Sequence, residues 1–155
     1  LERARTGGLR RRRGRAGGLL LTATAVVAPS ASADERTCRG TLRAVTVDDV
    51  KVPRGATCRM YGTRVKGNIT VGSKAMLKGH NMRVDGNIQL EQGRGLTLNR
   101  NIVDGDIQVF SNRSGYKNIY SNRVDGNLQC KSNSPAPKGA RNIVKGNKED
   151  QCRRL

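Results

Sequence analysis

Carboxylate and carboxamide side chains recur along this sequence at a nearly constant spacing. The phrases VDGNIQL (84–90), VDGDIQV (103–109) and VDGNLQC (124–130) each carry three such groups at alternate positions. The nine residues are Asp85, Asn87, Gln89, Asp104, Asp106, Gln108, Asp125, Asn127 and Gln129. Such groups can hydrogen-bond the hydroxyls of a sugar polymer, and stacked carboxylates can hold a hard cation such as calcium. The pattern predicts a polar binding face, and the alternative interpretation is that the amides form structural ladders.

Polysaccharide cleavage is the catalytic chemistry that this pattern could support. Asp85, Asp104 and Asp106, placed beside Arg83 or Arg123, would imitate the clusters of Asp and Arg found in pectate lyases and polygalacturonases. Those enzymes work beside a long groove, and this chain has little length for the side loops that build one. No G-x-S-x-G motif frames a nucleophile either. We therefore expect a protein that is not an enzyme.

Metal and cofactor sites have little support in the sequence. The Asp column lacks the D-x-[DN]-x-[DN] spacing of a calcium loop. The chain has a single histidine, His80, and no C-x-x-C pair, which argues against a zinc site. We expect His80 to be an exposed corner residue, and we predict neither a metal nor a cofactor.

The Asp, Asn and Gln residues belong to a sequence repeat, which must set their positions in the fold. The glycines of the V-x-G phrases fall at Gly67, Gly86, Gly105, Gly126 and Gly146, and the intervals between them are nearly equal. Self-similarity with a fixed period of roughly 20 residues is the signature of a solenoid.

The repeat unit is a strand unit because its apolar residues alternate with polar ones. Val84, Ile88 and Leu90 illustrate this period of two, which is typical of a half-buried strand. Left-handed hexapeptide solenoids keep a period of 18, so 19–21 favours the right-handed form. The sequence predicts an all-β, single-domain, right-handed parallel β-helix of about six coils.

The four cysteines are spaced so that each pair joins adjacent coils. Cys38 lies about one period of the repeat before Cys58, and Cys130 lies about one period before Cys152. Stacked coils lie about 4.8 Å apart, within disulfide reach. We predict the disulfides Cys38–Cys58 and Cys130–Cys152, one at each end, where a solenoid frays. Each could contribute on the order of 3 kcal/mol.

The longest coil, 109–122, contains two of the few aromatic residues. Tyr116 and Tyr120 lie there, and if one coil makes a specific contact this coil is the best candidate. The alternative is that they only cover the side of the solenoid. A chain with three Tyr, one Phe and no Trp has few platforms for base stacking, so we expect no specific nucleic-acid partner.

The N-terminal residues 1–33 have the pattern of a cleaved signal peptide. Seven arginines precede the apolar run GLLLTATAVVA (18–28), and a small-residue cleavage site ends at Ala33. The run is too short to span a bilayer, so we expect no membrane span after cleavage. Residues 34–155 form the predicted β-helix domain and hold 23 Lys and Arg against 11 Asp and Glu, a formal charge of +12. That charge favours anionic cell-wall polymers or polysaccharides as partners, at the cell envelope or outside the cell.

The phrase also carries a resemblance. The motif V-x-G-[ND]-[IL]-x-[VL] recurs at 65–71, 84–90, 103–109 and 124–130, the last copy ending in Cys130. It resembles bactofilin domains, small polymer-forming β-helix proteins of bacteria, over about residues 45–147. The ending at 126–152 is similar to small secreted actinobacterial proteins of unassigned function. Bactofilins are cytoplasmic and polymerise through open ends, whereas this chain is expected to be exported with stapled ends, so self-association stays open.

Three functions follow in order of preference. The first is a secreted, non-enzymatic structural or interaction protein at an anionic cell envelope. The second is a carbohydrate-binding module that uses the Asp/Asn/Gln face. The third is a small β-helix polysaccharide lyase or hydrolase.

Overall fold

Residues 34–155 form a stack of short strands. The computed structural model describes these residues, and the predicted leader 1–33 lies outside them. Every regular element in the described part of the chain is a β-strand, and all strand pairs are parallel. None of the described residues forms a helix long and apolar enough to cross a membrane.

The strands belong to three sheets, here called A, B and C. Sheet A runs β1 (Glu35–Thr37), β4 (Asp49–Val52), β7 (Ile69–Val71), β10 (Ile88–Glu91), β13 (Ile107–Phe110), β16 (Leu128–Lys131) and β19 (Lys148–Asp150). Sheet B runs β2 (Thr41–Arg43), β5 (Thr57–Tyr61), β8 (Met76–His80), β11 (Gly95–Asn99), β14 (Lys117–Tyr120) and β17 (Lys138–Ala140). Sheet C runs β3 (Thr46–Val47), β6 (Arg64–Val65), β9 (Arg83–Val84), β12 (Ile102–Val103), β15 (Arg123–Val124) and β18 (Ile143–Val144).

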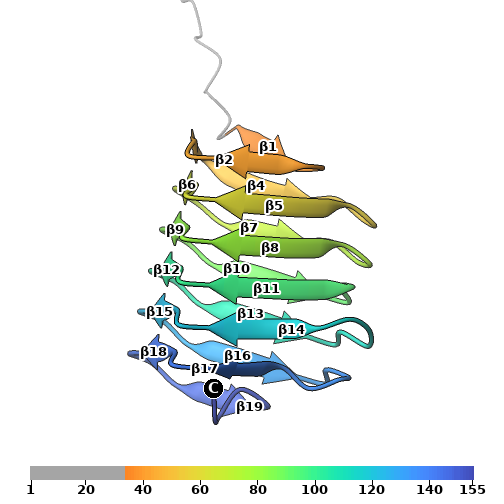
Figure 1. The fold of residues 1–155 in the computed structure, drawn as a ribbon, viewed down its shortest axis with the longest axis vertical. Coiled ribbons are helices and arrows are strands. Elements are labelled where there is room, and N and C mark those ends of the chain that lie inside the picture. The colour runs from red at the N-terminus through yellow and green to blue at the C-terminus, as the bar shows by residue number, and fades with distance from the viewer. Residues whose placement is uncertain (1–33) are drawn as a thin grey trace, which may run out of the picture. The chain divides into compact units, whose positions relative to one another are not determined.

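Each coil visits sheets A, B and C in turn before the chain steps down to the next. In Figure 1 the strands of sheet B cross the front from right to left, and those of sheet A return behind them as the chain descends. This sense of rotation is right-handed, as it is in nearly all parallel crossovers. The predicted right-handed β-helix of about six coils is confirmed.

The register sets the length of each coil. Val65, Val84, Val103 and Val124 are paired in sheet C and fully buried, so equivalent residues of successive coils lie directly above one another. The step from Val47 to Val65 is shorter than the later ones and falls below the predicted range. Side chains alternate between the two faces of each strand, so every second residue points inward. The apolar residues at these inward positions form a core that runs the whole length of the stack.

Glycine marks the corner between sheets C and A because two backbones meet there. The Gly86 N–H donates to the Gly67 carbonyl oxygen at 3.0 Å. A Cβ on Gly86 would lie 2.5 Å from that oxygen. The V-x-G phrase therefore needs glycine for the contact between coils.

The corner after sheet B turns through a left-handed residue in every coil, and the corner after sheet A does so after every strand except β1, with φ between 45° and 72°. After sheet A these residues are Gly55, Lys74, Gln92, Ser111, Ser132 and Asp150. After sheet B they are Ala44, Gly62, Asn81, Arg100, Ser121 and Arg141. Only two are glycine, and hydrogen bonds between coils, such as Lys74 N–H to the Gln92 carbonyl at 2.8 Å, hold the rest in place.

Disulfides join coils at both ends of the stack. Cys38–Cys58 and Cys130–Cys152 have Cα–Cα distances of 5.5 and 5.2 Å, and both predicted pairs are confirmed. Two disulfides fit an oxidising environment such as the outside of a cell.

One inward column ends in a cation at each terminus of the stack. The column consists of Val50, Ile69, Ile88, Ile107 and Leu128. Arg36 pairs with Val50 at the N-terminal end, and Lys148 pairs with Leu128 at the C-terminal end. Lys148 Nζ also donates to the carbonyl oxygen of Leu155, which packs onto the core beyond Cys152.

Candidate functional site

The predicted polar residues lie in three columns on and beside sheet A. Asp85, Asp104 and Asp125 follow β9, β12 and β15 at the corner between sheets C and A. The Asn and Asp residues that come two positions later line the same corner. The Gln residues point outward from the strands of sheet A.

Arginines neutralise the Asp column. Arg64 Nη2 donates to Asp85 Oδ2 at 3.0 Å, and Arg83 Nη2 donates to Asp104 Oδ2 at 3.1 Å. Arg83 Nε also lies 3.4 Å from Asp85 Oδ1. The predicted cluster of Asp85, Asp104 and Arg83 therefore exists as a ladder of alternating charges.

Two of these carboxylates are held ionised. The hydrogen bond from Arg64 lowers the pKa of Asp85, and Arg83 adds to the effect. Lys145 Nζ, 2.8 Å from Asp125 Oδ2, lowers the pKa of Asp125 in the same way. A general acid needs a raised pKa, so neither carboxylate suits that role.

The second column bonds to the backbone of the next coil. Asn68 Oδ1 accepts from the Asn87 N–H at 2.9 Å, and Asn87 Oδ1 accepts from the Asp106 N–H at 2.7 Å. Asp106 Oδ1 accepts from the Asn127 N–H at 2.6 Å. These hydrogen bonds join successive coils at the corner between sheets C and A, as expected if the amides form structural ladders.

The glutamine column is a side-chain ladder on sheet A. Gln89 Nε2 donates to Gln108 Oε1 at 2.9 Å, and Gln108 Nε2 donates to Gln129 Oε1 at 3.1 Å. Gln129 Nε2 then donates to Glu149 Oε2 at 2.9 Å. Gln108 and Gln129 thus each use one donor and one acceptor within the protein, Gln89 uses one donor, and recognition of sugars by this face stays a prediction.

The two candidate tyrosines lie apart from these columns. Tyr120 is the last residue of β14 in sheet B, and Tyr116 lies immediately before that strand. Their exposed fractions are 73% and 40%.

His80 is not the exposed corner residue that we expected. It is the last residue of β8 and is only half-exposed. Its ring stacks on Tyr61, with centroids 5.4 Å apart and planes 9° from parallel. Tyr61 on β5 and His80 on β8 are register partners, which brings the two rings together. The sequence of one strand alone does not reveal this pairing.

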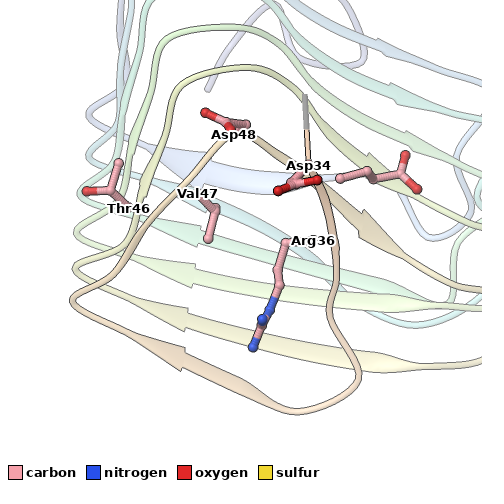
Figure 2. A pocket seen from close by; sticks show the side chains of 6 residues that line it. Asp34, Arg36, Thr46, Val47 and Asp48 are labelled. Atoms are coloured by element: carbon pink, nitrogen blue, oxygen red, sulfur yellow. The ribbon is translucent and has the colours of Figure 1, made fainter. Parts of the chain in front are cut away.

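The depressions on the described surface are shallow and open. One of about 470 Å³ lies at the N-terminal end and is lined by Asp34, Arg36, Val47 and Asp48 among others. Figure 2 shows the Arg36 side chain extending away from the Asp48 carboxylate, so the charges there do not converge on one point. Among residues 34–155 no three His, Cys, Asp or Glu side chains are grouped as a metal site requires.

Sequence reasoning missed two buried asparagine ladders. At the corner between sheets B and C, Asn101 N–H donates to Asn122 Oδ1, and Asn122 N–H donates to Asn142 Oδ1, both at 3.0 Å. At the corner between sheets A and B, Asn112 Nδ2 donates to Asn133 Oδ1 at 2.8 Å. The signal was available, because these asparagines recur in the sequence at the period of the repeat.

Lys117 is the other residue that the sequence did not single out as buried. It occupies the register position of Leu96 on the inner face of sheet B, with an exposed fraction of 1%. Its Nζ donates to the carbonyl oxygens of Asn112, Ser114 and Ser134 at 3.1–3.2 Å. Burial lowers its pKa.

Comparison with models of known families, with curated proteins and with solved structures finds no match for this chain. The bactofilin resemblance therefore rests on the V-x-G repeat and stays a prediction. What the chain does must be argued from its own residues.

Proposed function

We propose that this protein is a secreted, non-enzymatic structural or interaction protein that is held at an anionic cell envelope by its basic surface. The observation that carries the proposal is the formal charge of +12 on residues 34–155. Such an excess of cations attracts polyanions and keeps the protein near them.

The bonds between coils suit a structural role outside the cell. A disulfide locks each end of the stack, and hydrogen bonds between coils line all three corners. Several polar side chains that could act in catalysis or binding form contacts that stabilise the stack of coils. Asp85 and Asp125 are paired with cations, and Asn87 and Asp106 bind backbone N–H groups.

These bonds also rank the alternatives. A glycoside hydrolase needs a carboxyl group that can donate a proton, and the lowered pKa values of Asp85 and Asp125 oppose that role. A lyase needs a base that removes a proton from the sugar, and a carboxylate whose pKa is lowered is a weaker base. Carbohydrate recognition by the Asp/Asn/Gln face needs free donors and acceptors, many of which the ladders already use. We therefore place both below envelope attachment.

A pull-down with purified cell wall over a salt series tests the proposal. Attachment by charge should be strong at low ionic strength and should fall steeply as salt screens the cations. Binding that survives high salt would point to hydroxyl recognition. Turnover in a glycan depolymerisation screen, abolished by Asp104→Asn, would replace the proposal with the enzymatic alternative.

A further inference from the structure

Charge is divided unevenly between the faces of the solenoid. No strand of sheet B contains an Asp or Glu, and the eleven carboxylates of residues 34–155 lie on sheet A, in the loops beside it or at the N-terminal end. Sheet B carries four cations on its outer face. They are Arg43, Arg59, Lys78 and Lys138.

Two of these cations are neighbours in the stack. Arg59 on β5 is in register with Lys78 on β8, one coil away, at a strand spacing of about 4.8 Å. Like charges directly opposite each other destabilise a sheet. The ion pairs among the described residues lie on the other faces, so no carboxylate offsets this repulsion. An external anion would offset the repulsion between Arg59 and Lys78.

Another outward column of sheet B holds one more cation in a fixed position. The Arg43 guanidinium lies 4.7 Å from the centroid of the Tyr61 ring, which in turn stacks on His80. Stacking of this kind orients a guanidinium before any ligand arrives and reduces the entropy lost on binding.

A hollow of about 410 Å³ opens on the same face beside these columns. It lies between Met76 and Tyr116, where Gly95 contributes no side chain. Thr97 and Asn118 also line it, which provides a hydroxyl and an amide. The hollow thus combines an apolar platform with polar groups, as a sugar-binding site requires.

Two cations flank the hollow. Lys78 and Arg94 line it, and Arg94 Nη2 donates to Thr57 Oγ1 at 2.9 Å, which holds the guanidinium against the face. A ring lying on Tyr116 would therefore have its charged substituent within reach of a fixed Arg and a neighbouring Lys.

We propose that the outer face of sheet B binds a linear acidic polysaccharide of the polyuronate type, with one sugar ring in the hollow and successive carboxylates against Arg59, Lys78 and Arg94. The inference rests on the proposed function and names the face and the ligand class that would carry it. A polyuronate has one carboxylate on every ring, which matches the cations that Arg59 and Lys78 place on two successive coils.

Single-stranded nucleic acid fits the face less well. Stacking of successive bases needs successive open aromatic surfaces. The facing surfaces of Tyr61 and His80 are taken up by each other, and Arg43 covers another side of Tyr61. Tyr116, immediately before β14, is the aromatic side chain on this face with most of its surface free.

Calorimetric titration of the oxidised protein with alginate, at low ionic strength, tests the proposal. The double variant Arg59→Gln/Lys78→Gln removes two charges from sheet B, and Lys51→Gln/Lys131→Gln removes two exposed charges from sheet A. We expect the first to lower the affinity about tenfold and the second less than about threefold. Tyr116→Ala should also weaken binding, whereas Tyr116→Phe should retain it.

The variants should fold, because all of these side chains point outward and loss of Arg59 and Lys78 relieves repulsion; a melting temperature that does not fall verifies this. Equal losses in the two double variants would overturn the inference while leaving the proposed function intact. An oligodeoxynucleotide of matched charge that binds as tightly through sheet B would also overturn it. If the unmodified protein bound neither alginate nor cell wall, the proposed function itself would fall.

Discussion

Two columns of asparagine hold two corners of the solenoid, and they differ in their access to water. At the corner between sheets C and A, Asn87 is half-exposed and uses its Oδ1 to accept the Asp106 N–H. At the corner between sheets B and C, Asn122 is buried and uses both ends of its amide. Its Oδ1 accepts from Asn101, and its Nδ2 donates to the Leu98 carbonyl oxygen and to Asn142.

This difference explains which residues each corner contains. The half-exposed column needs only an acceptor, because water satisfies the rest, and Asp serves there as well as Asn. Asp49 and Asp106 occupy equivalent positions and accept the N–H of the next coil. In the buried column Asn101, Asn122 and Asn142 each use a donor and an acceptor, and the equivalent buried positions of the two preceding coils hold Thr63 and Met82. Burial therefore disfavours the aspartate that the half-exposed column accepts, because a buried carboxylate would lack a donor, but it admits residues other than asparagine.

The sharpest test replaces asparagine by aspartate in the buried column. Asn122→Asp removes the Nδ2 donor and places a carboxylate oxygen against the Leu98 carbonyl and the Asn142 Oδ1. We expect the free energy of unfolding to fall by about 3 kcal/mol or more, since a buried charge would lack a partner. Urea denaturation of the oxidised protein measures it. A loss below about 1 kcal/mol would show that water reaches this corner.

The same exchange in the half-exposed column should have little effect. Asn87→Asp keeps the acceptor for the Asp106 N–H, so we expect a change within about 0.5 kcal/mol. Asn87→Ala removes that acceptor and should cost about 1 kcal/mol. Both values come from the same urea titration. If Asn87→Asp were as damaging as Asn122→Asp, the distinction between the corners would be lost.

At the corner between sheets A and B, Lys117 should make the free energy of unfolding depend on pH. Lys117 binds the Asn112 carbonyl oxygen there, and its folded pKa lies below the ordinary lysine value of 10.5 because the ammonium is buried. The unfolded chain therefore binds more protons than the folded one between those two pKa values, and stability should rise with pH across that window. Lys117→Met lacks this gain. Unfolding free energies of both proteins at neutral pH and near pH 10.5 should diverge in favour of the wild type; parallel curves would contradict the assignment.

The smallest effect should come from the exposed glutamine ladder. Gln108→Ala breaks the side-chain bonds to Gln89 and Gln129 but leaves no buried group unsatisfied. We expect a change within about 0.5 kcal/mol in the same denaturation assay. A loss like that of Asn122→Asp would mean that the ladder contributes cooperatively.

The fold was predictable because the repeat supplies its own register. Gly67, Gly86 and Gly105 stand one coil apart, and once the period is known the pairing of Cys38 with Cys58 follows. The three polar columns were predicted as columns for the same reason. Their bonding was not, because a sequence does not tell whether Asn87 faces a backbone N–H or solvent.

The buried polar residues were harder to predict because they contradict the rule that apolar residues fill the core. Asn122 and Lys117 look like surface residues in composition, and only their place in a coil reveals burial. The cationic face of sheet B was hidden for a different reason. Its charges are spread through the sequence, and Arg59 and Lys78 become neighbours only when the coils stack.

The cations at the two ends of the inward column would lie at the junction if one molecule stacked on another. Head-to-tail stacking would bring Arg36 of one copy towards Lys148 of the next, at positions where coils within a molecule place Val50 against Ile69. Two like charges enclosed at such a junction would repel each other and would lose their hydration. We therefore expect these cations to oppose head-to-tail stacking unless an anion lies at the junction.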